Sequence, residues 1–219
     1  MVDRTSVHVT IHFCPPHRVR PVLDVLDEYG LYADDDPMEG RSAVFVGRRY
    51  SAAEIDCGSS TLVRSDLIDR APEVAFTVYE EPAYDGVGTV YSHVSGLGLF
   101  AALCGNSGEP MFSRDYMLEL EGEPAEVRHH ELGVPWTTAI GAMPDMVVVA
   151  PDRFDAWWNL SHGEVAVLGG TALGEDLILS ANDVVEVDAA LSKQGLRRFE
   201  DWTSDTDLRH VAVYRSTSD

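Results

Sequence analysis

The order of strand-like and helix-like segments is the feature of this sequence that most limits how the chain can fold. Residues 7–13 alternate between apolar and polar side chains, which is the period-2 pattern of a half-buried strand. Apolar residues between 19 and 26 then recur at helical spacing, and Gly30 stands where a helix C-cap is expected. The first strand is therefore expected to bury Val7, Val9, Ile11 and Phe13.

The next segments complete a recognisable order. Strand-like runs at 43–46 and 53–57, which could pair with each other, precede a helical pattern at 59–70 and a strand-like run at 74–79. The order is β-α-β-β-α-β, that of the ferredoxin-like unit, in which two helices pack on one face of an antiparallel sheet.

The same order is predicted again in the second half of the chain. The expected elements are a strand at 146–150, a helix at 152–160, a hairpin of 164–168 with 176–179, a helix from Asn182 to Gly195 and a strand at 210–214. Two β-like runs at 88–94 and 97–103, followed by a turn at 105–108, indicate a hairpin between the two halves.

We therefore predict an α+β protein of two ferredoxin-like units in tandem, with a β-hairpin extension after the first. The polar segment Glu121–Pro124 is the best linker candidate, because it carries Gly and Pro near the middle of the chain. The predicted units are residues 1–121 and 122–219, which could also pack as one continuous domain.

The charge balance limits the class of partner. The 219 residues hold 37 acidic side chains against 16 Lys and Arg, a formal net charge of −21. Binding to a nucleic-acid backbone is not expected, because phosphate contacts require a basic face. The charge fits a surface that attracts a basic protein, and it is equally explained by solubility alone. The candidate acidic binding residues are Asp34, Asp35 and Asp36 before a proline, and Glu119, Glu121 and Glu123, which would share one face of an extended segment.

Two adjacent tryptophans give a second candidate binding surface. On the predicted helix 152–160, Trp157 and Trp158 diverge by about 100°, so one of them is expected to be buried and the other exposed. An exposed Trp beside acidic residues is typical of a protein-binding hot spot, although core packing explains these residues as well.

Common cofactor and metal motifs are absent from the sequence. The only lysine, Lys193, follows no Gly-rich loop, which excludes a Walker A motif, and there is no GxGxxG, HExxH, GxSxG or EF-hand loop. We expect no cofactor and no metal. The three cysteines form no CxxC pair, and no stretch is apolar and long enough to cross a bilayer. We therefore expect a cytoplasmic protein without a membrane segment.

One short motif suggests catalysis. The run Val7-His8-Val9-Thr10-Ile11 resembles the hydrophobic-His-x-Thr-hydrophobic motif of the two-histidine phosphoesterases, and Ser92-His93-Val94-Ser95 is a looser copy. The resemblance implies that His8, Thr10, His93 and Ser95 lie together on neighbouring strands. Each His would then act as an acid or base on a cyclic or 2′,3′-phosphate.

Three functions follow from the sequence. The leading interpretation is a non-catalytic acidic protein that binds a basic protein partner, in an inhibitor, immunity-type or anti-defence role. The alternatives are a phosphoesterase-like hydrolase and a structural subunit of a larger assembly.

Overall fold

The computed structural model describes residues 3–33, 43–83, 86–150, 153–168, 177–181, 183–199, 201–205 and 208–215. The chain divides into two compact units, Met1–Ala150 (unit 1) and Pro151–Asp219 (unit 2). The boundary thus lies after Ala150, whereas the sequence predicts it after Glu121. The polar segment at 121–124 instead connects two helices within unit 1.

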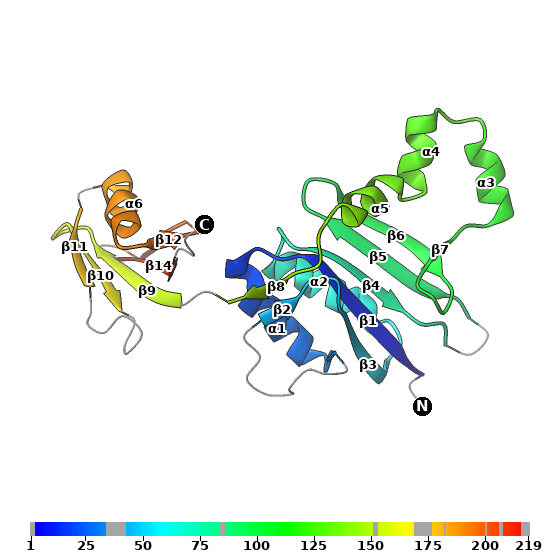
Figure 1. Cartoon of the computed structure of the whole chain (residues 1–219), viewed down its shortest axis with the longest axis horizontal. Coiled ribbons are helices and arrows are strands. Elements are labelled where there is room, and N and C mark those ends of the chain that lie inside the picture. Colours follow the sequence, from blue (N-terminus) through cyan, green and yellow to red (C-terminus); the bar gives the residue numbers. More distant parts are fainter. Residues whose placement is uncertain are drawn as a thin grey trace. The chain divides into compact units, whose positions relative to one another are not determined.

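Unit 1 is built on a six-stranded antiparallel sheet (Figure 1). In spatial order its strands are β3 (Arg49–Asp56), β1 (Arg4–Phe13), β4 (Ala75–Glu80), β5 (Gly88–Val94), β6 (Gly98–Cys104) and β7 (Pro110–Met111). The predicted hairpin is present as β5 and β6, and it extends this sheet instead of forming a separate structure. The mixed α+β class is confirmed.

Two helices cover one face of the sheet. They are α1 (Val19–Glu28), which follows a short 3₁₀ turn η1 (Pro16–Arg18), and α2 (Ser59–Arg70), in agreement with the sequence prediction. Val7, Val9 and Ile11 are fully buried against these helices, as expected. Phe13 is 44% exposed, because the register between β1 and β4 shifts after Ile11 and the alternation does not continue.

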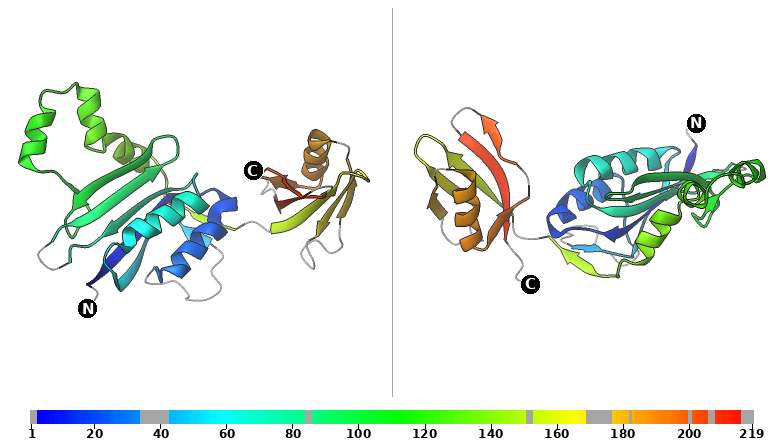
Figure 2. Two further views of the ribbon diagram at one scale, coloured as in Figure 1. Left: turned by 180° about the vertical axis from the view of Figure 1, so that it is seen from behind. Right: turned by 90° about the horizontal axis from the view of Figure 1, so that it is seen from above.

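On the opposite face of the sheet lies α5 (Val134–Gly141), as the view from above in Figure 2 shows. Trp136 of α5 packs with Phe100 and Val94 in a second, smaller core on this side. Two further helices, α3 (Arg114–Leu120) and α4 (Ala125–Glu131), lie beyond the end of the sheet formed by β6 and β7 (Figure 1). We call the two sides of the sheet the α1/α2 face and the α5 face.

One predicted pairing is wrong. The strand β2 (Ala43–Phe45) pairs with β8 (Val147–Val149), not with β3. β2 and β8 form a two-stranded sheet of their own, after which the amide of Val46 donates to the carbonyl of Met146 and the amide of Gly47 donates to the carbonyl of Ile11 in β1. In a ferredoxin-like unit, the second strand of the sequence pairs with the third. In unit 1, β2 does not pair with β3.

Unit 2 has its own antiparallel sheet. Its strands are, in spatial order, β11 (Leu177–Ser180), β10 (Glu164–Leu168), β9 (Arg153–Asn159), β14 (Leu208–Arg215) and β12 (Leu196–Arg198), with β13 (Thr203–Asp205) also paired to β14. The helix α6 (Val184–Lys193) packs on the sheet through Val187 and Leu191. Its N-cap is Asp183, whose side chain accepts from the amide of Glu186, and not the predicted Asn182.

The predicted helix at 152–160 is wrong, because these residues form the central strand β9, hydrogen-bonded to β10 and β14. Unit 2 therefore has the order β-β-β-α-β-β-β and not the predicted β-α-β-β-α-β. Aromatic side chains favour strands. A short run with apolar residues is compatible with a helix or a strand, and here the pairing with β10 and β14 makes it a strand. Among the described residues, no helix combines the length and apolarity required to cross a membrane.

Candidate functional site

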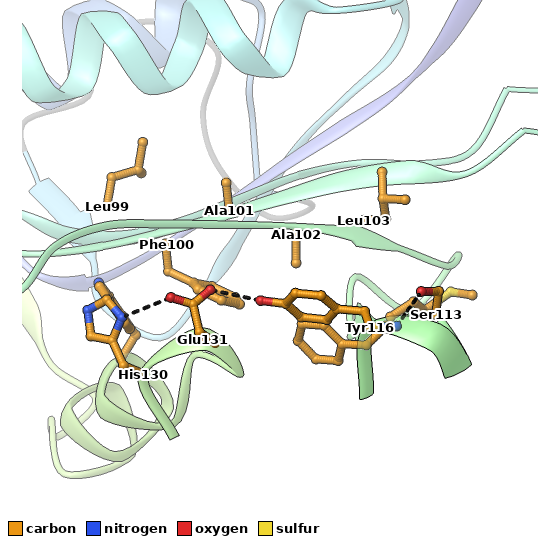
Figure 3. Close-up of a pocket in the computed structure, with 12 residues that line it drawn as sticks. Leu99, Phe100, Ala101, Ala102, Leu103, Ser113, Tyr116, His130 and Glu131 are labelled. Atoms are coloured by element: carbon orange, nitrogen blue, oxygen red, sulfur yellow. Dashed lines mark hydrogen bonds and ion pairs between the residues drawn. The ribbon is translucent and has the colours of Figure 1, made fainter. Parts of the chain in front are cut away.

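A groove runs along β6 on the side away from β5, with a volume of about 530 Å³. Five consecutive residues of the strand, 99–103, form one side, and the other walls come from the segment 111–116 and from His130, Glu131 and Trp136 (Figure 3). We call this site the β6 groove. Successive residues of a strand point to opposite faces, so a cavity lined by five in a row lies against the edge of the strand itself.

Within the described residues, the edge of β6 is occupied only at its two ends. β7 pairs with Leu103 and Cys104, and the indole N–H of Trp136 donates to the carbonyl oxygen of Gly98 at 2.9 Å. The main-chain groups of Leu103 face β7, and the N–H and C=O of alternate residues point to the same side of a strand, so the main-chain groups of Leu99 and Ala101 also point into the groove. These residues have no strand partner there among the described parts of the chain.

The opposite edge of the sheet, on β3, is partly covered by another segment of the chain. On β3, the amide and carbonyl of Ser51 both bond to Tyr32, so a neighbouring segment covers part of that edge. Proteins commonly cover edge strands, because exposed main-chain groups recruit other strands. The open stretch of β6 is therefore a place where a further strand can add.

The two sides of β6 offer different surfaces, as Figure 3 shows. Leu99, Ala101 and Leu103 point to the α1/α2 face and are exposed there, with Leu103 53% exposed. Phe100 and Ala102 point the other way, towards Tyr116 and Glu131. The groove is thus apolar along the strand and carries polar groups on its far wall.

The polar wall is held by a contact between two helices. The hydroxyl of Tyr116 on α3 donates to Glu131 Oε2 on α4 at 2.8 Å. That hydrogen bond, more than burial, raises the pKa of Tyr116. The other carboxylate oxygen, Oε1, lies 3.8 Å from Nδ1 of His130, and the His130 ring meets the edge of Trp136. The carboxylate of Glu131 is therefore oriented on the wall while its side chain remains 47% exposed.

The two histidines of the phosphoesterase-like motif are not brought together. His8 lies opposite Tyr79 on β4 and His93 lies opposite Phe76 on the same strand. Positions 76 and 79 point to opposite faces, so His8 projects from the α5 face and His93 from the α1/α2 face, with β4 between their strands. No single phosphate can be flanked by both imidazoles.

Each of these histidines has partners of its own. His8 places Nε2 3.0 Å from Glu81 Oε1 and Nδ1 2.8 Å from Ser51 Oγ, and its ring stacks on Tyr79. His93 is buried and donates from Nδ1 to the carbonyl of Val74. These bonds tie neighbouring strands and loops together.

The two other residues of that motif lie apart as well. Thr10 lies opposite Thr77 in the middle of the sheet, half-buried. Ser95 is exposed in the turn between β5 and β6. The catalytic set predicted from the motif is therefore not assembled.

Of the two predicted groups of acidic residues, the structure describes only the second. Asp34, Asp35 and Asp36 lie outside the described residues. The second group does not lie on one face of an extended segment, because Glu119 is in helix α3 while Glu121 and Glu123 follow in the turn after it. All three are exposed. Between Arg114 and Glu131 there are six acidic residues and two arginines, so the helices that border the β6 groove carry a net negative charge.

The two tryptophans do separate into a buried and an exposed side chain, although on a strand. Trp158 is 3% exposed and packs against Trp202 in the core of unit 2, while Trp157 is 40% exposed. Period-2 alternation, and not divergence around a helix, is the cause.

Comparison with known proteins identifies no relative, because no family model, curated protein or solved structure matches the chain. Within the described residues, no group of three or more His, Cys, Asp and Glu side chains is arranged to hold a metal ion.

The β6 groove is absent from the sequence predictions. The apolar run at 97–103 marks β6 as a strand, but periodicity does not reveal whether a strand has one neighbour or two. The short β7 and the position of Trp136, which leave the edge open, are long-range contacts.

Proposed function

We propose that this chain is a non-catalytic binding protein that captures an extended segment of a basic protein partner in the β6 groove. The observation that carries the proposal is the open edge of β6 between Trp136 and β7, which lines an apolar groove. A bound segment would add to the sheet as a further strand, in line with β7.

Main-chain hydrogen bonds to Leu99 and Ala101 would supply affinity that does not depend on sequence, as in other cases of strand addition. Apolar contacts with Leu99 and Phe100 would add to it by removing their surface from water. The stretch from 99 to 102 matches about four residues of ligand, so binding by this site alone would be weak to moderate.

The partner is expected to be basic because of charge complementarity. The whole chain carries a net charge of −21, and the helices bordering the groove are acidic. Long-range attraction would raise the association rate and would weaken as salt rises above about 0.1 M. An inhibitor, immunity-type or anti-defence role would use the same surface, by masking a segment of a basic protein.

The experiment is to select peptides and then locate them on the protein. A display library of ten-residue random peptides is selected on the immobilised full chain at low salt, and the enriched sequences are synthesised. Hydrogen exchange measured on the complex should show protection of the Leu99 and Ala101 amides, because each would bond to the added strand.

A matched pair of variants tests the main-chain contact. Ala101→Pro removes the outward N–H at an edge position where proline is tolerated, whereas Ala101→Ser keeps it. Peptide affinity should fall about tenfold or more in the first variant and stay within about twofold in the second, with circular dichroism confirming that both are folded. Protection located away from 98–103, or equal affinity of the two variants, would refute strand addition.

A further inference from the structure

The sheet geometry determines which face each residue of a strand added to β6 would point to. Directly opposed residues of neighbouring strands point to the same face. Ligand residues opposite Leu99 and Ala101 would therefore lie on the α1/α2 face, and those opposite Phe100 and Ala102 would point to the wall that carries Tyr116 and Glu131. Alternate residues of the ligand thus meet two chemically different environments.

The α1/α2 side of the groove selects aliphatic residues. Leu99 is 36% exposed and Leu103 is 53% exposed, and Met111 of β7 beside them is 51% exposed. A ligand side chain opposite Leu99 or Ala101 would complete this apolar row as a cross-strand neighbour. A β-branched residue such as Val or Ile fits best, because such side chains pack well on a pleated surface.

The wall on the other side selects a cation. Glu131 offers a carboxylate held in place by the hydroxyl of Tyr116, and its side chain is 47% exposed to the groove. It is also the last residue of α4, where the helix dipole disfavours a negative charge and favours a positive one. Phe100 and Tyr116 provide an apolar and aromatic passage for the stem of a long side chain, which lysine and arginine can use.

We infer that the β6 groove recognises a strand in which aliphatic and basic residues alternate, with one Arg or Lys side chain bound to the carboxylate of Glu131. This inference rests on the proposed function. The alternation and the negative wall together define the ligand more narrowly than net charge does. A basic segment without alternation would place charges against the apolar side chains of Leu99 and Ala101.

The test compares three end-blocked peptides of nine residues. In the first, Val and Arg alternate between terminal serines; the second has the same residues with all Val before all Arg; the third has Gln in place of Arg. Their dissociation constants are measured by fluorescence anisotropy on the full chain, at about 0.05 M and 0.3 M salt. The alternating Arg peptide should bind at least about fivefold more tightly than either of the others at low salt.

Two variants of the protein locate the recognised charge. Glu131→Gln should weaken binding of the alternating Arg peptide about fivefold and abolish its advantage over the Gln peptide. Glu123→Gln removes the same charge from the exposed turn after α3, outside the groove, and should change affinity less than twofold.

The outcomes separate this inference from the proposed function. Equal affinity for the alternating and the ordered Arg peptides, or equal effects of Glu131→Gln and Glu123→Gln, would overturn the alternating motif. Strand addition would still stand in that case if the Leu99 and Ala101 amides were protected. Failure of every peptide to protect those two amides would overturn the proposed function, and the motif with it.

Discussion

The indole N–H of Trp136 donates to the carbonyl oxygen of Gly98 at 2.9 Å, and so joins helix α5 to the first residue of strand β6. The same indole ring packs on Phe100, at 5.5 Å between ring centres. One side chain thus closes an end of the β6 groove and anchors the helix that borders it.

Replacing Trp136 by Phe should destabilise unit 1 by about 1 to 2 kcal/mol, because the Gly98 carbonyl loses its donor while most of the apolar contact is kept. Chemical unfolding followed by circular dichroism measures the change. Trp157→Phe, at a site 40% exposed in unit 2, is the control and should cost less than about 0.5 kcal/mol. Equal costs would mean that the indole hydrogen bond contributes nothing.

Gly133, just before α5, is the second position on which the groove depends. Its φ of +73° is unfavourable for other residues, and an added Cβ would lie 2.7 Å from the ring of Phe100. Gly133→Ala should therefore cost about 2 to 4 kcal/mol and weaken peptide binding by moving Phe100.

Gly141 at the end of α5 is the matched control for that substitution. It has no positive φ, and a Cβ there meets nothing within 4 Å. Gly141→Ala should leave stability unchanged or raise it by up to about 1 kcal/mol. A Gly133→Ala variant as stable as Gly141→Ala would show that the contact with Phe100 relaxes freely.

A pH dependence follows from His12 on β1. Burial lowers its pKa below 6.5 and outweighs the opposing effect of Asp145, while its Nε2 lies 2.9 Å from Thr77 Oγ1. The unfolded chain therefore binds a proton at a higher pH than the folded protein does. Stability should fall as pH decreases from about 6.5 towards the lowered folded-state pKa, and this contribution should level off below it.

Urea unfolding at pH 7.5, 6.0 and 5.0 measures that effect, in the wild type and in His12→Gln. The variant should lose less stability over this range than the wild type. His129→Gln, an exposed histidine on α4, should follow the wild-type curve. Parallel curves for the wild type and His12→Gln would contradict the assignment.

In unit 2, the adjacent tryptophans should differ sharply in their contribution to stability. Trp158→Ala opens a cavity beside Trp202 and Val187 and should cost about 3 to 5 kcal/mol. Trp157→Ala should cost less than about 1 kcal/mol, because that side chain is already 40% exposed. The reverse order would show that the register of β9 is wrong.

Local patterns predicted most elements of unit 1 correctly. The alternation of Val7, Val9 and Ile11, the helical spacing that gives α1 and the run that gives α2 all depend on neighbours within a few residues. The β5–β6 hairpin also connects segments close in the chain. Short-range periodicity is therefore sufficient for these parts.

The incorrect predictions have a common physical origin, because each concerns a feature whose structure depends on partners distant in sequence. β2 pairs with β8, about 100 residues further along the chain, and β9 is a strand because β14 lies beside it. The two motif histidines, His8 and His93, point to opposite faces because their register with β4 differs by an odd number of residues. No local pattern carries this information.

By itself, the sequence determined the α+β class, the position of most strands and of helices α1 and α2 of unit 1, and the acidic net charge, since these depend on side-chain type and local spacing. Only the tertiary structure decided the candidate site. The groove exists because β7 is two residues long, Trp136 reaches Gly98, and Tyr116 and Glu131 meet from separate helices. Such contacts form when distant segments pack together, so their geometry is set by the whole of unit 1 and not by any one segment.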